Sequence, residues 1–148
     1  MSDSRIVQFL AGEGRDGAGR TADEVLTFDD DRLEARHDFI QWLFPLTEPS
    51  AAVPGSPVLS RDDVAALVAS DLAQMRLARA ARRMLAFYGA TGGWRAPADH
   101  NHLRITRIIR SLRLLSGDAA ADAFRQKILA LAEDAPISAT SRAYWNAA

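Results

Sequence analysis

The sequence predicts an all-α protein, an irregular bundle of seven or eight helices without a sheet. Apolar residues recur at helical spacing in segment after segment, and no window shows the alternation of apolar and polar residues that is typical of a strand. Clusters of glycine and proline separate these segments, as they do between helices. The length of 148 residues fits a single helical domain over residues 1–148.

Two helices are predicted near the N-terminus. The first covers residues 5–10 and ends at the glycine-rich segment 12–19. That segment contains the letters GxGxxG of dinucleotide-binding loops, but the fingerprint needs a strand before it, so we expect a plain flexible loop. Thr21, followed three residues later by Glu24, has the capping-box pattern that starts the second helix.

The most distinctive stretch is residues 33–46, with the sequence LEARHDFIQWLFPL. At helical spacing Leu33, His37 and Ile40 fall on one face, and the last turn is apolar almost all round. We therefore expect one continuous helix that is buried at its end and stops near Leu43, because Pro45 disfavours helix at Phe44. We also expect this segment to pack against an isoleucine-rich helix later in the chain.

A proline-rich connector over residues 47–57 leads to a long helical pattern that begins at the cap residue Ser60 and continues to Tyr88. The cap-like pair Ser70–Asp71 predicts a break within it. Beyond the break, one broad apolar face is predicted, with arginines on the opposite face. Its members are Met75, Ala78, Ala81, Leu85 and Tyr88.

Three helices are predicted in the last third of the chain. The first begins after Asp99, and its stripe is the most regular in the sequence: Ile105, Ile108, Ile109, Leu112 and Leu115. Gly117 ends this helix, and a second helix follows. The third begins at Ser138, and we expect its Tyr144 and Trp145 to close the core. Leu103 and Leu114 fall among arginines on the outer side of the first helix, which suggests contact with another element or a partner.

Composition excludes several classes of protein. There is no cysteine, so disulfides and thiolate metal sites are excluded, and no stretch is long and apolar enough for a membrane span. The N-terminus lacks a signal-peptide pattern, so we expect a cytoplasmic protein. Lys127 is the only lysine among 18 basic residues, and this arginine bias suggests a GC-rich bacterial genome.

The sequence gives little reason to expect catalysis, a metal or a cofactor. His37 permits three interpretations: a base, a ligand, or a buried imidazole bonded to a carbonyl, which is the commonest fate of a lone core histidine. A zinc site built from His37, His100 and His102 would need a carboxylate or water as its fourth ligand, and nothing in the spacing brings these histidines together. No serine has the context of a nucleophile elbow. We therefore expect a protein that is not an enzyme.

Arginines line two predicted helix faces and form a candidate basic surface. They would either contact phosphates or pair with acids near Asp23, Glu24 and residues 29–31. A net charge of -1 favours the second interpretation, so nucleic acid is not the expected partner. The candidate surface comprises Arg76, Arg79, Arg83, Arg107, Arg110 and Arg113.

Three motifs resemble the conserved domain of the opioid growth factor receptor family. Residues 37–45 read HDFIQWLFP, residues 84–89 read MLAFYG, and residues 101–110 read NHLRITRIIR. The resemblance covers most of the chain. Animal members of the family bind an enkephalin peptide and associate with the nucleus and membranes, so the resemblance implies receptor-like peptide binding.

The partners we expect are a peptide or small molecule, or a protein partner that includes self-association. A groove beside Trp42 would hold the ligand, with polar motif residues fixing its polar groups and Trp42 offering apolar surface. The candidate ligand-binding residues are His37, Asp38, Gln41, Trp42, Asn101, His102 and Arg104.

Overall fold

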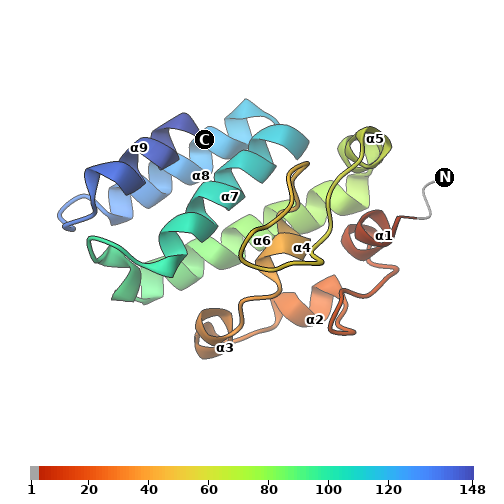
Figure 1. Cartoon of the computed structure of the whole chain (residues 1–148), viewed down its shortest axis with the longest axis horizontal. Coiled ribbons are helices and arrows are strands. Elements are labelled where there is room, and N and C mark those ends of the chain that lie inside the picture. Colours follow the sequence, from red (N-terminus) through yellow and green to blue (C-terminus); the bar gives the residue numbers. More distant parts are fainter. Residues whose placement is uncertain (1–3) are drawn as a thin grey trace. The chain divides into compact units, whose positions relative to one another are not determined.

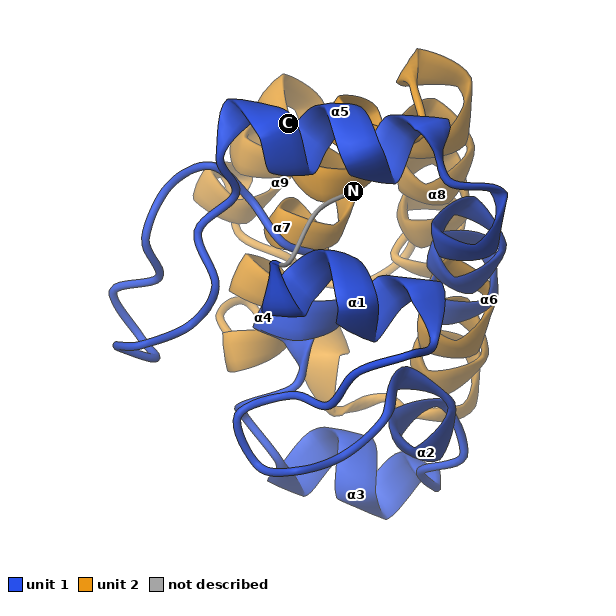
Figure 2. Cartoon of the chain, turned by 90° about the vertical axis from the view of Figure 1, so that its right-hand side faces the viewer, with its two compact units in different colours: residues 1–80 blue, residues 81–148 orange. Residues whose placement is uncertain are grey.

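The computed structural model in Figure 1 describes residues 4–148. Over these residues it contains nine α-helices and one 3-10 turn, and an isolated bridge between Leu46 and Val58 is the nearest approach to a strand. The predicted all-α class is therefore confirmed. The chain divides into two compact units, residues 1–80 and residues 81–148, which are coloured separately in Figure 2.

Unit 1, residues 1–80, contains five short helices and the start of a long one. The Thr21–Glu24 capping box forms as predicted, and Ser60 and Asp63 form a second one. Helix α1 packs against α4 and α5. The elements are α1 (Arg5–Ala11), α2 (Ala22–Leu26), α3 (Asp30–Ala35), α4 (Ile40–Leu43), α5 (Arg61–Ala69) and the beginning of α6 (Asp71–Ala90). The predicted break at Ser70 is present between α5 and α6.

The predicted continuous helix around Trp42 is wrong. It is two pieces, α3 and α4, separated where Arg36 adopts extended backbone with φ -92° and ψ 136°. A straight helix buries one stripe, but all six residues 39–44 are buried, so the chain must turn before it enters the core. The turn leaves His37 and Asp38 exposed and therefore removes His37 from the apolar face.

Unit 2, residues 81–148, is built on α7 (His100–Leu115), which packs against α8 (Asp118–Leu131) and α9 (Ala139–Ala147). Asp99 caps α7, and every member of its isoleucine-rich stripe is buried, as predicted. Trp145 is fully buried, but Tyr144 is 59% exposed, so Trp145 alone of this pair joins the core. Leu103 and Leu114 are both exposed.

The buried face of α6 differs from the predicted one. It carries Ala73, Leu77, Ala80, Met84, Phe87 and Tyr88, whereas Met75 is 46% exposed. The arginines at 76, 79 and 83 therefore border the buried face instead of lying opposite to it. An arginine tolerates such a position because its aliphatic stem covers apolar surface while the guanidinium reaches a polar partner.

Candidate functional site

Trp42 on α4 is covered by its own unit. Phe9 of α1 makes an edge-on ring contact with it at 5.4 Å between centroids, and the Arg5 guanidinium lies 5.5 Å from the ring centroid. A Cβ atom on Gly17 would lie 3.8 Å from Cζ2 of the indole, so the glycine-rich segment also lies against the ring. Trp42 thus has little surface to offer a ligand unless these neighbours move.

The glycine-rich segment is an ordered turn, and a buried aspartate holds it in place. Asp16 Oδ1 accepts hydrogen bonds from the backbone N–H groups of Ala18 and Arg20, each at 2.9 Å. Its other oxygen accepts from Arg20 Nε at 2.8 Å, and its side chain is fully buried. We did not predict this role for Asp16. An aspartate ahead of Gly17 and Gly19 is the turn-forming pattern that would have indicated it.

Arg20 links this turn to the Trp42 motif. It pairs with Asp16 at 2.8 Å and with Asp38 Oδ1 at 3.0 Å. Burial by itself lowers the pKa of Arg20, but its hydrogen bonds to the two carboxylates outweigh that effect and raise the pKa above its ordinary value. Asp38 is therefore engaged in an ion pair within unit 1, although half of its side chain is exposed.

Gln41 is the unusual polar residue of α4. It is 8% exposed, and its Oε1 atom is buried without a hydrogen-bond partner anywhere in residues 4–148. Buried side-chain amides normally have partners for their oxygen, because an unpaired one loses its hydrogen bonds to water without compensation. Gln41 is thus the candidate residue with an acceptor available for a further molecule.

The candidate residues Asn101 and Arg104 lie together on α7 in unit 2. Asn101 is buried, and its Oδ1 accepts from the Tyr88 hydroxyl at 3.2 Å and from Arg104 Nη1 at 3.4 Å. Its Nδ2 donates to Asp99 Oδ1 at 3.0 Å. These bonds connect the end of α6 to the first turns of α7, which is a structural role.

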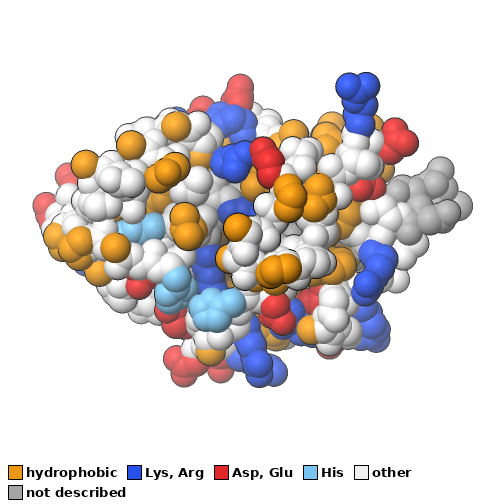
Figure 3. Space-filling view, in the orientation of Figure 1, with side chains coloured by type: hydrophobic (Ala, Val, Ile, Leu, Met, Phe, Trp, Pro, Cys, Tyr) orange, Lys and Arg blue, Asp and Glu red, His pale blue; other side chains and the backbone are white. Residues whose placement is uncertain are grey.

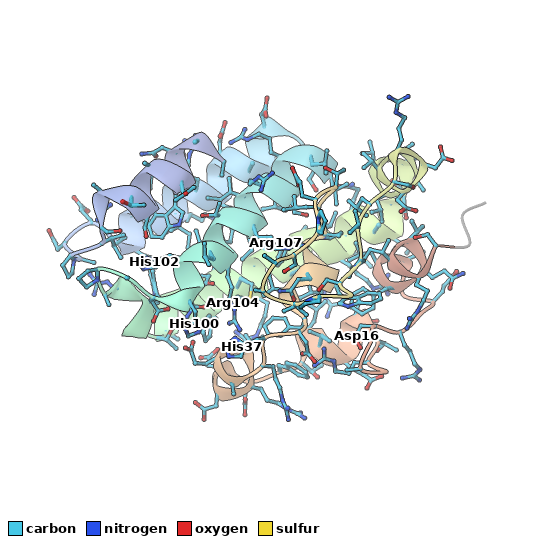
Figure 4. All side chains as sticks on the ribbon, viewed as in Figure 1. Asp16, His37, His100, His102, Arg104 and Arg107 are labelled. Carbon is cyan, nitrogen blue, oxygen red and sulfur yellow. The ribbon has the colours of Figure 1, made fainter. Side chains whose placement is uncertain are left out.

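His102 is a core histidine with partners for both ring nitrogens. Its Nε2 lies 2.7 Å from the carbonyl oxygen of Trp94, and its Nδ1 lies 2.8 Å from Ser141 Oγ on α9. Trp145 adds an edge-on ring contact at 5.3 Å and donates its indole N–H to the backbone carbonyl of His102. His102 and Arg104 are labelled on α7 in Figure 4.

Two of the three motifs, residues 37–45 and 84–89, lie in a region that matches a known protein family. Residues 21–92 match the opioid growth factor receptor (OGFr) conserved region. The human opioid growth factor receptor is 40% identical over 103 residues, covering 55% of this chain but only 15% of the human protein. The mouse opioid growth factor receptor-like protein 1 is 29% identical over 118 residues, 68% of this chain and 24% of that protein. No solved structure matches the chain significantly.

The OGFr-matched region contains the unit 1 candidates and excludes the α7 candidates. His37, Asp38, Gln41 and Trp42 all lie within residues 21–92, whereas the motif that begins at Asn101 lies beyond them. The chain spans less than a quarter of the length of each of these two relatives. The chain is therefore similar to the opioid growth factor receptor conserved region over residues 21–92, and the similarity covers only a small part of the full-length relatives.

The arginine surface of the OGFr-like chain is largely engaged in ion pairs. Asp23 accepts from Arg76 at 3.2 Å and from Arg79 at 3.1 Å, and the Arg76 hydrogen bond is the main reason that the pKa of Asp23 lies below its ordinary value. Arg113 pairs with Asp118 and Asp122, each at 2.8 Å, and these bonds raise the pKa of Arg113. Arg110 is exposed, and Arg83 and Arg107 are half-buried.

Basic and acidic side chains are interspersed on the face drawn in Figure 3. Arg76 and Arg79 pair with Asp23, in agreement with the interpretation, favoured by the net charge, that these arginines pair with acidic residues and not with phosphates. In the described part of the chain, no three His, Asp or Glu side chains gather as metal ligands do. No helix over residues 4–148 is both long and apolar enough to cross a bilayer.

Proposed function

We propose that the chain is a member of the opioid growth factor receptor family and that its domain binds a peptide or small molecule at Gln41. The observation that carries the proposal is the buried, unpaired Oε1 atom of Gln41, which lies in the OGFr-matched region. A ligand that supplies a hydrogen-bond donor to this atom would remove the deficit. Because Trp42 is the next residue, the environment of its indole would change when the ligand binds.

The free-energy cost of the unpaired oxygen supports a role in binding. Burying an amide oxygen without a partner costs about 1–3 kcal/mol. An apolar side chain of similar size would avoid that cost, so a glutamine here reduces stability unless something else is gained. A ligand that donates a hydrogen bond to Gln41 Oε1 removes this free-energy cost, and the free energy recovered strengthens binding. This explains why a glutamine occupies the position.

The chemistry of the missing partner defines the ligand class. Gln41 Oε1 is an acceptor only, so the ligand must present an N–H or O–H group. Peptides carry such donors in their main-chain amides and their terminal ammonium group. Two of the relatives are named receptors for an opioid growth factor in human and rat, and a peptide ligand for this chain is the proposal that follows from those names.

Nuclear magnetic resonance tests the proposal on the intact chain. An enkephalin peptide, its N-acetylated form and a panel of free amino acids are titrated while the Gln41 side-chain amide and the Trp42 indole N–H signals are followed. We expect shifts of both signals with at least one of these ligands, and loss of binding in Gln41→Leu. Gln74→Leu is the matched control, because Gln74 Nε2 already donates to the Leu67 carbonyl at 3.0 Å. Binding that survives Gln41→Leu, or no shift with any ligand, contradicts the proposal.

A protein-interaction role is the second candidate. Leu103 is 71% exposed and Leu114 is 38% exposed on the outer side of α7, where a partner could cover them. Sedimentation at increasing concentration would show self-association, and Leu103→Ser would reduce it. A nucleic-acid role has less support, because Arg76, Arg79 and Arg113 already pair with carboxylates. The cytoplasmic location and the bacterial origin stay predictions.

A further inference from the structure

The contacts of His102 point to a second, unrelated chemical capacity in unit 2. We propose that Ser141 is an activated nucleophile that accepts an acyl group from reactive esters, with His102 as its general base. The Oγ atom of Ser141 lies 2.8 Å from Nδ1 of His102, which is within the range of a nucleophile–base hydrogen bond. This proposal is independent of binding at Gln41.

The Trp94 carbonyl determines which way the proton lies between His102 and Ser141. A carbonyl oxygen can only accept, so the Nε2 atom of His102, 2.7 Å away, must carry a hydrogen. In the neutral imidazole the other nitrogen, Nδ1, then has a lone pair and accepts the hydroxyl proton of Ser141. This is the tautomer that a general base for serine needs, and here a backbone carbonyl selects it in the way that a carboxylate does in the Ser-His-Asp triad.

The surroundings hold the pair in one geometry. Trp145 contacts the imidazole edge-on and donates to the His102 carbonyl at 3.1 Å, so the base has little freedom. Ser138 Oγ accepts the backbone N–H of Ser141 at 3.1 Å. The Ser138 hydroxyl, also 3.1 Å from Ser141 Oγ, can donate its proton to that atom. The hydroxyl contact favours the Ser141 rotamer that faces His102, and the backbone contact fixes the first turn of α9 around it.

Ser141 is accessible enough to react. It is partly exposed, whereas His102 behind it is buried, and Thr140 and Tyr144 on the same helix are exposed. Ser141 lies in the first turn of α9, where the backbone N–H groups of Ala139 and Thr140 have no acceptor within the helix, whereas that of Ser141 is bonded to the Ser138 cap. Those N–H groups favour negative charge nearby, as an acyl-transfer intermediate would develop.

The reaction balances with an ester and water alone. Ser141 Oγ forms a bond to the acyl carbon while His102 Nδ1 takes the hydroxyl proton. The bond from the acyl carbon to the leaving alcohol oxygen then breaks, and the imidazolium returns the proton to that oxygen. Water attacks the acyl-serine in the same way and regenerates the hydroxyl, so the products are a carboxylic acid and an alcohol.

Acetylation with p-nitrophenyl acetate tests the proposal on the full chain. Peptide mass mapping after short exposure should place one acetyl group on Ser141, at a rate at least ~100-fold above that of Ser60, the gain typical of a positioned base. Ser60 is the matched internal reference, because it is an exposed helix cap that lies in a capping box with Asp63, a carboxylate instead of an imidazole. Lys127 provides a second benchmark for general acylation.

Three variants and a solvent isotope effect decide the outcome. Ser141→Ala should abolish the site, Thr140→Ala at the exposed neighbouring position should retain it, and His102→Gln should slow labelling of Ser141 to the Ser60 rate. Because His102→Gln affects the core, a solvent isotope effect on the unmodified chain is the parallel readout: labelling of Ser141 should be slower in D2O than in H2O, because His102 takes the hydroxyl proton while the bond to the acyl carbon forms. Labelling of Ser141 no faster than Ser60, or at the same rate in D2O as in H2O, overturns the proposal.

Discussion

Gln41 and His102 are buried to nearly the same degree, 8% and 5% exposed, and each lies in one of the motifs that suggested a ligand site. Their hydrogen bonds differ. Both ring nitrogens of His102 have partners, whereas Gln41 Oε1 has none within residues 4–148. Two polar side chains of similar burial can thus differ completely in their hydrogen bonds, so burial alone is a weak guide to the role of a polar residue.

The largest effect should come from His102→Ala. The change leaves the Trp94 carbonyl and Ser141 without their partner and opens a cavity beside Trp145, which should lower the free energy of unfolding by about 3 kcal/mol. Urea denaturation measures the loss. His100→Ala, at an exposed position two residues away, should change it by less than about 0.5 kcal/mol. Equal effects of the two changes would refute the structural role of His102.

Gln41→Leu should have a smaller effect of opposite sign. Removing an unpaired acceptor should leave the free energy of unfolding unchanged or raise it by up to about 1 kcal/mol, because no hydrogen bond is lost. Gln74→Leu removes a real bond to the Leu67 carbonyl and should lower it by about 1 kcal/mol. The same denaturation assay compares them, and a clear loss of stability in Gln41→Leu would show that the amide already has a partner.

The smallest effect concerns the Asp23 ion pairs. Because its hydrogen bond from Arg76 lowers the pKa of Asp23 in the folded state, this carboxylate stabilises the fold fully above its ordinary pKa of 3.8, and the contribution is lost as the pH falls through the lower folded pKa. The side chain is 52% exposed, so the effect should be under about 1 kcal/mol. Asp23→Asn should reduce stability at pH 7 and not at pH 2. A loss that persists at pH 2, or one matched by exposed Asp134→Asn, would contradict this.

Helix positions were predictable because caps and spacing are local signals. The capping box at Thr21, the cap at Asp99 and the stripe on α7 all follow from nearby residues. The split between α3 and α4 was not predictable, because Leu33 and Ile40 also fit one continuous helical face. The division into two helices depends on the burial of every residue from 39 to 44, which is a property of tertiary packing and not of sequence spacing.

The buried face of α6 was missed for a related reason. This alanine-rich helix offers two apolar stripes, one with Leu77 and Met84 and one with Met75 and Leu85, and sequence spacing does not choose between them. The ligand-site residues stay a prediction. His37 and Asp38 are exposed, His102 is buried in the core of unit 2, and Gln41 Oε1 has no hydrogen-bond partner within residues 4–148. Hydrogen bonds of buried atoms depend on tertiary neighbours, so no sequence pattern could have separated these residues.

The three tryptophans divide between the two units. Trp42 lies in unit 1 with a guanidinium near its ring, whereas Trp94 and Trp145 lie in unit 2 with ring centroids 6.5 Å apart. Two indoles at that separation couple electronically, so the near-ultraviolet circular dichroism of the chain should be dominated by this pair. The fluorescence emission of Trp42 can be obtained as the difference between the unmodified chain and Trp42→Phe. This emission would then follow the unfolding of unit 1, while the circular dichroism signal follows the unfolding of unit 2.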